Sequence, residues 1–413
     1  MTATNALSVA ILKRRYATGK VPKANFVDFP FVSMVEKKED FIGDDYAIAI
    51  QTENPQGVGT SVQAAQNAAA QGNYVRFLLT RLEYFGIARI KGQALRTATI
   101  KGDGAMVDLW KNETDGITQT VLKMLEIYGF GTGNGVLGTI STGVSTGVVT
   151  LTTVEDVNCF DLGMKVRLVS DTTLSPVTRA GEATITGIDR AAGTLTLAAG
   201  NWNAIVIGAT NGDSIVRSGD QASAAVAAVP TGMRQWLVGG TTPGTLKSLN
   251  RNTDPVRLAS QSLDMTGLPM ADGIVDLESL ISVQGKLSKK TMWANPRDFR
   301  NVKKTQMGKV TFPRADVKST IASISFSAIQ WEGDAGMIPM MLSPFCPRNN
   351  VFLKDMSTFA LYSAGPAPQP LDFDKSDFLR VATDDAYELR IGLYGDYGDN
   401  SPVQSARGTN WGL

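Results

Sequence analysis

Few residues in this chain could do chemistry, because its 413-residue sequence contains no histidine. Without histidine there are no Ser-His or Cys-His nucleophile pairs, and no imidazole for metal binding or for proton transfer near neutral pH. A histidine-free enzyme could still use Ser288 beside Lys286 or Lys289, with a lysine as the base. These residue types are common and no motif surrounds them, so the sequence favours a protein that is not an enzyme.

Gly133-Asn-Gly135-Val-Leu-Gly138 has the glycine spacing of a dinucleotide-binding loop. Such a loop needs a strand before it and a helix after it, so that the helix N-terminus faces the pyrophosphate. Here a helical pattern precedes the glycines and a strand pattern follows them. Lys20, Lys286 and Lys309 each follow a glycine, but none precedes the Ser or Thr of a phosphate-binding loop. We therefore expect no cofactor, and interpret the glycines as a helix exit where chain segments pass closely.

Acidic side chains are the other candidates for chemistry. The neighbours in Asp44-Asp45 and in Asp384-Asp385 point to opposite faces of an extended chain, so neither pair makes a catalytic couple. Asp372, Asp374 and Asp377 could surround a calcium ion, but the glycine and the distal glutamate of the calcium-loop pattern are missing from the sequence. A solvated turn explains these residues better, and we expect no metal site.

The bulk composition narrows the class of protein. The chain is 43% hydrophobic and 19% charged with a net charge of +1, so no overall field attracts nucleic acid. No apolar run is long enough for a membrane span, and the order of charge and apolar residues near the N-terminus is the reverse of a signal peptide. Cys159 and Cys346 form neither a metal-ligand spacing nor a disulfide framework. We expect a soluble protein made in a cytoplasm.

A modest basic cluster lies near the N-terminus. A solvated helix face explains it, and weak electrostatic contact with nucleic acid or an acidic partner is the alternative. Its members are Lys13, Arg14, Arg15, Lys20 and Lys23.

The most informative pattern lies between residues 46 and 90. A strand-like run, Tyr46–Thr52, leads into a tip of small and polar residues, and a second apolar run from Tyr74 to Ile90 leaves it. A two-stranded arm of this kind is barely stable alone in water, because its tip buries too little apolar area to offset its conformational entropy. It makes sense when it lies on another copy of the protein. The subunit-contact residues that we expect are Tyr46, Ile48, Ile50, Tyr74, Arg76, Phe77, Phe29 and Phe31.

Two further elements flank this arm. Residues 1–35 predict a short helix followed by an extended segment, because Pro22 and Pro30 break helical structure. Residues 104–130 repeat apolar side chains at spacings of three, four and seven, which predicts one helix of about 40 Å. The glycines from Gly129 onward end it.

The remaining segments alternate between strand-rich and mixed character. Residues 138–221 are rich in Thr, Val and Gly and predict a small antiparallel β domain, a barrel or a sandwich, inserted into the main fold. Residues 222–345 are mixed α/β, with one helix capped by Asn295. Residues 385–396 alternate apolar and charged side chains and predict a strand with one buried face. The Gly/Ser/Asn-rich tail from Gly398 predicts a surface arm.

The order of these parts resembles that of tailed-bacteriophage major capsid proteins of the Hong Kong 97-type fold, across nearly the whole chain. The phrases that resemble the family are Ala94-Leu-Arg through the long helix to Tyr128-Gly-Phe-Gly131, Thr291-Met-Trp-Ala-Asn-Pro-Arg-Asp-Phe299, Ala360-Leu-Tyr and Arg390-Ile-Gly-Leu-Tyr394. The resemblance implies an α+β fold whose parts are an N-terminal arm (1–35), an extended loop (36–92), a peripheral domain (93–137 and 346–413) with a spine helix (104–130), an inserted β domain (138–221) and an axial domain (222–345).

The resemblance also implies a structural role. Many copies would form hexamers and pentamers that tile an icosahedral phage head around double-stranded DNA. The extended loop would lie across a neighbour's spine-helix domain, the axial domain would gather around the local symmetry axis, and the N-terminal arm would reach an adjacent subunit. The implied partners are other copies, a separate scaffolding protein, a portal protein and a decoration or cementing protein, with non-specific contact to packaged DNA and none to a membrane. The protein would assemble in the host bacterial cytoplasm and end in the virion.

Two features depart from some members of that family. No lysine lies between Tyr46 and Ile90, so this loop cannot supply the isopeptide bonds that lock some shells. The loop also begins close to Met1, which leaves no room for a sizeable N-terminal scaffolding segment unless the chain is already processed. Three alternatives stay open: a nanocompartment shell of the encapsulin type, a phage tail or adhesin component, which the Thr/Gly-rich β segment suggests, and the histidine-free enzyme.

Overall fold

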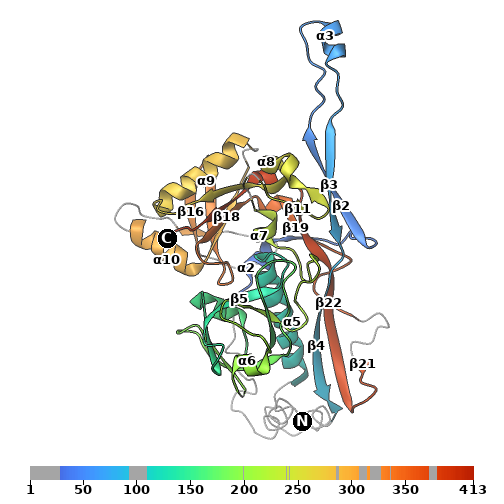
Figure 1. Cartoon of the computed structure of the whole chain (residues 1–413). Helices are drawn as coiled ribbons and strands as arrows, with labels where there is room; N and C mark the ends of the chain where they lie inside the picture. The colour runs from blue at the N-terminus through green and yellow to red at the C-terminus, as the bar shows by residue number, and fades with distance from the viewer. Residues whose placement is uncertain are drawn as a thin grey trace.

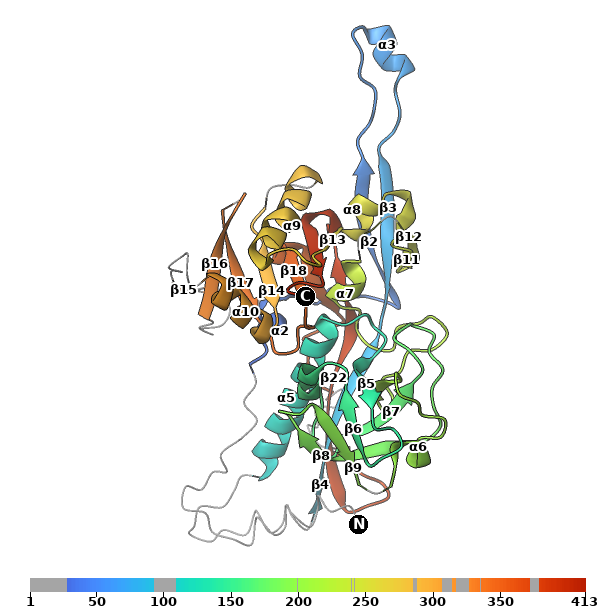
Figure 2. The ribbon, with the colours of Figure 1, turned by 60° about the vertical axis from the view of Figure 1, so that its left-hand side comes forward.

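The computed structural model consists of a body and a long two-stranded arm that projects from it (Figures 1 and 2). The described residues are 28–92, 109–198, 200–238, 240, 242–284, 288–306, 314–316, 327–334, 336–371 and 379–413. The helix expected within residues 1–35, the basic cluster from Lys13 to Lys23, and the candidate calcium loop from Asp372 to Asp377 lie outside them.

A spine helix and a long ribbon of two strands form one half of the body. The helix is α5 (Leu109–Gly129), and the ribbon pairs β4 (Glu83–Lys91) with β22 (Ala386–Asp399) in antiparallel register. A Cβ on Gly86 of β4 would lie 2.6 Å from the Val121 side chain of α5, so only glycine permits this close approach. Among the described residues the ribbon belongs to a six-stranded sheet completed by β1 (Glu36–Lys38), β19 (Phe359–Ser363), β20 (Gln369–Pro370) and β21 (Leu379–Arg380).

A seven-stranded sheet, counted over the described residues, forms the second half of the body. Its order is β13 (Gln261–Asp264), β23 (Ser405–Thr409), β18 (Asn350–Lys354), β14 (Thr291–Ala294), β17 (Gly336–Leu342), β16 (Ser327–Gly333) and β15 (Arg314–Asp316). Met292 and Ala294 on β14 share one core cluster with Ile274 of α9 (Met270–Gln284) and Phe299 of α10 (Pro296–Gln306). The two helices therefore cover the same face of this sheet.

The start of α10 follows the sequence signal. The Arg297 N–H donates a hydrogen bond of 3.0 Å to the Asn295 side-chain oxygen, and Pro296 stands at the first helical position. The cap satisfies one of the backbone donors that a helix leaves free at its start. This part of the prediction is confirmed.

The tail beyond Gly398 is not a surface arm, so that expectation was wrong. Strand β23 lies between β13 and β18, and the fully buried Trp411 donates its indole N–H to the Met270 carbonyl at 3.0 Å. The small residues of this segment serve close packing, since a Cβ on Gly408 would lie 2.5 Å from the Met265 methyl group. The segment 346–413 is thereby shared between the two sheets, with β18 and β23 in one and β19 and β22 in the other.

A closed barrel follows the spine helix in the sequence. It is built from β5 (Val136–Thr142), β6 (Val148–Leu151), β7 (Lys165–Val169), β8 (Ala183–Asp189), β9 (Thr194–Leu197) and β10 (Ser214–Arg217). In the β8–β9 hairpin, the Asp189 carboxylate accepts the N–H groups of Ala191 and Ala192 at 2.9 and 3.0 Å. Gly193 ends the turn with a φ of +68°. Of the two folds predicted for this segment, the barrel is the one observed.

Polar contacts fix the barrel to the body at two places. Asp220, at the barrel exit, accepts hydrogen bonds from the hydroxyl groups of Tyr84 on β4 and Tyr128 on α5. On the other side, Glu155 pairs with Arg348 at 2.9 Å and with Arg297 of α10 at 2.7 Å. The barrel is therefore held against both halves of the body.

The other described helical segments and strands of the body are short. They are α2 (Pro30–Met34), α6 (Trp202–Ile205), α7 (Met233–Trp236), α8 (Pro255–Ala259), β11 (Thr245–Leu246), β12 (Leu249–Asn250), and the 3-10 turns η1 (Val154–Cys159), η2 (Arg251–Thr253), η3 (Met356–Thr358) and η4 (Pro402–Gln404).

Candidate assembly surfaces

The projecting arm is built from β2 (Asp45–Glu53) and β3 (Asn73–Thr80), which pair in antiparallel register with Ile48 opposite Phe77. The tip carries a short helix, α3 (Val62–Asn67), whose Ser61 side chain caps it by accepting the Ala64 N–H at 3.2 Å. In both views the tip stands clear of the body (Figures 1 and 2).

The second apolar run of this region divides into two strands. Residues 74–80 stay in the arm, whereas residues 83–91 leave it and pair with β22 over their whole length. The reason is the pattern of β4, in which Tyr84, Gly86 and Ala88 alternate with exposed residues and face the body. The projecting part of the predicted loop 46–90 therefore ends at Thr80.

Three of the eight predicted contact residues are buried in their own chain. Ile48 is 5% exposed, and Phe77 and Phe31 are fully buried. Phe77 packs edge-on against Trp236 with ring centroids 5.0 Å apart. Phe31 lies 4.8 Å from the Phe130 ring. For these three residues the prediction was wrong, because their apolar side chains pack in the core of their own subunit and are not available to a neighbour.

The other five predicted contact residues are wholly or partly accessible. Tyr74 is 67% exposed and Arg76 is exposed beside it on β3. Phe29, Tyr46 and Ile50 are half-buried against the core. Their role as subunit contacts stays a prediction.

The base of the arm is braced against the body. The Leu78 N–H donates a hydrogen bond of 2.9 Å to the Lys247 carbonyl in the β11–β12 hairpin. On the other strand, the Arg257 guanidinium donates to the Thr52 carbonyl at 2.5 Å. Lys247 is itself paired with the fully buried Asp396. The lower half of the arm therefore has a fixed direction, and the tip projects from it.

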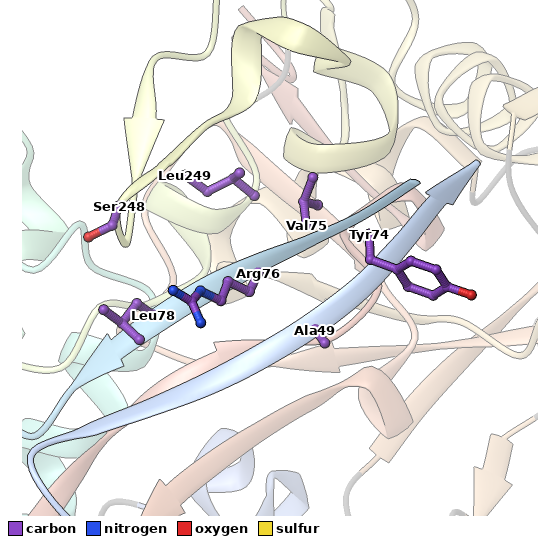
Figure 3. A pocket seen from close by; sticks show the side chains of 7 residues that line it. All are labelled: Ala49, Tyr74, Val75, Arg76, Leu78, Ser248 and Leu249. Carbon is purple, nitrogen blue, oxygen red and sulfur yellow. The ribbon is translucent and has the colours of Figure 1, made fainter. Parts of the chain in front are cut away.

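A shallow hollow of about 490 Å³ lies where the arm meets the β11–β12 hairpin (Figure 3). Apolar side chains and one cation line it, so it suits a side chain that is apolar along its stem and can meet a positive charge. The lining residues are Ala49, Tyr74, Val75, Arg76, Leu78, Ser248 and Leu249. Because Tyr74 and Arg76 belong both to this hollow and to the exposed side of the arm, the two form one surface.

The outer face of the β4–β22 ribbon is a second exposed apolar surface. Phe85 and Ile87 are 44% and 52% exposed, although α5 covers the opposite face of the same ribbon. The Phe85 ring packs against Tyr394 with centroids 5.5 Å apart. Neighbouring exposed apolar side chains with a charged rim are typical of interaction surfaces. Sequence reasoning missed this pair, which the i, i+2 spacing of Phe85 and Ile87 could have indicated.

The charged rim of that face also changes one prediction. The segment 385–396 was expected to have one buried face, with its charged side chains on the opposite face. Glu388, one of these charged residues, is instead 5% exposed. Arg390 and, to a lesser extent, Arg89 donate hydrogen bonds to its carboxylate and hold the pKa of that group below its usual value. The strand is therefore buried on more of its surface than simple alternation predicted.

Glu126 on α5 ties the end of the predicted N-terminal arm (1–35) to the body, where α2 starts at Pro30 and replaces the extended chain that was expected. This fully buried carboxylate accepts the N–H groups of Phe31 and Val32, in the first turn of α2, at 3.2 and 2.9 Å. It also accepts the Ser343 hydroxyl at 2.8 Å. Burial raises the pKa of Glu126 to about 7, although the three hydrogen bonds act in the opposite direction.

We expect Glu126→Gln to change how stability depends on pH. The native carboxyl has a pKa of about 7 against an ordinary value of 4.5, so the native state binds the proton more tightly than the unfolded state. The native chain should therefore lose stability as the pH rises from 4.5 to 7, by about 3 kcal/mol at about 1.4 kcal/mol per pKa unit.

Glutamine does not titrate, so the variant should gain that amount relative to the native chain between about pH 5 and pH 8. Urea unfolding of the variant and the native chain at about pH 5 and about pH 8 measures this change in the free-energy difference between them. Glu83→Gln, on the exposed side of β4, is the matched control. A free-energy difference that stays constant with pH would contradict the assignment.

The glycines with the spacing of a dinucleotide-binding loop lead from α5 into a strand. Gly133 and Gly135 precede β5, which begins at Val136 and contains Gly138, and a Cβ on Gly135 would lie 2.0 Å from the Asp220 carbonyl oxygen. This is the close chain passage that the sequence predicted. The Ser288 hydroxyl has no hydrogen-bond partner within the described part of the chain, and Lys286 lies outside that part. Cys159 and Cys346 are buried free thiols.

The described residues contain no group of three or more Cys, Asp or Glu residues placed to hold a metal ion. They also contain no helix with the length and apolar character that crossing a bilayer requires.

No family model matches the chain, and no curated protein matches it by sequence. The capsid of an empty GTA particle matches with a TM-score of 0.53 at 8% identity, over 99% of this chain and 98% of that chain. The cyanophage A-1(L) capsid matches with a TM-score of 0.52 at 10% identity, over 95% of each chain. The holo-SrpI encapsulin complex from Synechococcus elongatus PCC 7942 gives a TM-score of 0.47 at 10% identity, over 97% and 94%.

The chain therefore has the fold of tailed-phage capsid proteins, the Hong Kong 97-type fold, over nearly its whole length. The predicted fold class is confirmed.

Proposed function

We propose that this protein is the major capsid protein of a tailed phage or a related particle, and that it assembles as hexamers and pentamers into an icosahedral shell around double-stranded DNA. The observation that carries the proposal is the arm of β2 and β3, whose tip stands clear of its own body (Figure 1). A ribbon of two strands has little stability of its own in water. A second copy is the partner that such an arm needs.

In the proposed shell, the arm of one copy lies over the outer face of a neighbour's β4–β22 ribbon. The tip offers Val58 and Val62, which are 79% and 76% exposed, and the ribbon offers Phe85 and Ile87. Removing such side chains from water stabilises an interface by about 25 cal/mol per Å² of apolar area. Each contact is modest, and repetition over many copies makes the shell stable.

The proposal also covers the location of the protein and its partner proteins. The protein would act through structure and not through catalysis, and its location would be the virion after assembly in the host cytoplasm. Its partners would be a scaffolding protein, a portal protein and possible decoration proteins, with non-specific contact to packaged DNA. No lysine lies in residues 46–90 to form isopeptide bonds, so noncovalent contacts would hold the arms in place.

Expression of the full chain, alone and with its neighbouring genes, tests the proposal. Negative-stain microscopy should show closed shells, and those from the complete system should protect DNA from nuclease. Shells that hold a folded enzyme and no DNA would indicate a nanocompartment instead. Fibres or open rings would indicate a tail component. A chain that stays monomeric under all conditions would contradict a shell role.

A further inference from the structure

Helices α9 and α10 carry opposite charge. α9 contains three acidic residues and no Lys or Arg, and Asp272 and Asp276 are exposed on it. α10 exposes Arg300, Lys303 and Lys304. Its single acid, Asp298, is buried and bonded to Arg348 at 2.9 Å.

The basic character extends beyond α10 along the sequence. Residues 286–318 hold ten of the chain's 40 Lys and Arg residues, against two Asp, in a protein whose net charge is only +1. The exposed charges on the two helices, namely Asp272, Asp276, Arg300, Lys303 and Lys304, form no ion pair with any residue that the structure describes. Lys303 lies over the Phe299 ring of its own helix at 4.6 Å, so the other four are the charges most available to another molecule.

Helices α9 and α10 lie at opposite ends of the face of the seven-stranded sheet that they both cover. Gln284, the last residue of α9, shares a hollow with the arm residues Ile50 to Gln56, so α9 lies on the side of the arm. Arg297 of α10 is bonded to Glu155 of the barrel, so α10 lies on the side of the barrel. Figures 1 and 2 agree with this placement. The body thus has an acidic side next to the arm and a basic side away from it.

Charge decides which of these sides can meet between two copies. Two α9 helices face to face would oppose acids to acids, and two α10 helices would oppose cations to cations. Only α9 against α10 brings unlike charges together. Such a contact joins two different patches, so it repeats head to tail and generates rings when the rotation closes.

The spacing along the helices fits this pairing. Asp272 and Asp276 are one turn apart, as are Arg300 and Lys304. Val275 lies between Asp272 and Asp276, and Val283 lies two turns beyond Asp276 on α9; they are 53% and 77% exposed. Apolar residues inside a charged stripe are typical of a protein contact, and they have no role in a solvated face.

We infer that α9 of one copy pairs with α10 of the next copy around the ring, and that these opposite charges set the direction of the ring. This inference rests on the proposed shell function and names the partner surface within it. It agrees with the place of the arm, because the arm and α9 would then reach the same neighbour from the same side. Ion pairs at the rim of an interface act mainly on orientation and specificity.

Charge reversal with rescue tests the pairing. Asp272→Lys with Asp276→Lys makes both stripes basic, and Arg300→Glu with Lys304→Glu makes both stripes acidic. Each variant should reduce the yield of sedimentable shells at least about tenfold at moderate salt, because every contact in a ring then opposes like charges. The variant with all four substitutions has a basic α9 and an acidic α10, so unlike charges meet again, and it should recover most of the native yield of shells.

Controls separate the possible outcomes. Lys165→Glu, an exposed charge reversal on the barrel, should assemble like the native chain, and circular dichroism should show every variant folded. Native yield from both reversed variants, or no recovery in the fourfold variant, would overturn the pairing. Normal shells that lose their nucleic acid only in the Arg300/Lys304 variant would also overturn it, because α10 would then face the packaged nucleic acid. Failure of the native chain itself to form shells would count against the proposed function instead.

Discussion

A chain that lacks residues 54–72, with Glu53 joined to Asn73 through an Asn-Gly turn, should fold normally and form no closed shells. The cut follows the observed register, in which Glu53 pairs with Asn73, so the shortened hairpin keeps its strands aligned. The removed tip stands clear of the body and its apolar side chains Val58 and Val62 are exposed (Figure 1). Its loss should therefore leave the stability of the subunit within about 0.5 kcal/mol of the native value.

Sedimentation and thermal unfolding of the same preparations measure the two effects separately. Val58→Ser with Val62→Ser keeps the length of the tip and removes most of its apolar surface, so it should give an intermediate yield of shells. Normal shells from the deletion variant would remove the arm from the assembly. A large fall in melting temperature would show instead that the tip stabilises its own subunit.

The second large effect should come from the buried pair of Lys354 and Asp399, which joins the two sheets. Both side chains are fully buried, and the Lys354 ammonium donates hydrogen bonds to Asp399, Thr358 and Ser405 at 2.6 to 2.7 Å. Burial lowers the pKa of Lys354, while its partner carboxylate favours the charged form. Asp399→Ala would leave an unpaired buried cation and should destabilise the subunit by about 3–5 kcal/mol.

A double substitution isolates the cause of that effect. Lys354→Met with Asp399→Leu removes both charges, and it should recover most of the stability lost in Asp399→Ala, since an apolar replacement of a buried pair is often neutral. Urea unfolding of the single and double variants gives the comparison. A double variant as unstable as the single one would mean that shape and not charge dominates at this position.

Elements whose signals are local in sequence were predictable. The barrel strands follow from alternating Thr and Val residues, and the start of α10 follows from Asn295 and Pro296, because these preferences act over a few residues. The order of the parts was also enough to predict the fold class, which the matches to solved capsids confirm.

Features that depend on distant contacts were not predictable in the same way. Phe31 and Phe77 have the same character as a surface anchor, and only the approach of Phe130 and Trp236 from elsewhere in the chain makes them core. The tail looked like a surface arm because small residues indicate either exposure or close packing, and Met265 decides between the two at Gly408. The exposed pair Phe85 and Ile87 was hidden for a similar reason, since apolar residues on β4 were all assigned to the arm.

Cryo-electron microscopy of particles formed by the full chain tests the central claim most directly, because it shows which molecule each arm touches. The account predicts closed shells in which the tip around Val58 and Val62 lies over the outer face of an adjacent copy's ribbon, near Phe85 and Ile87. A tip that folds back onto its own subunit, or a chain that yields only monomers, would contradict it.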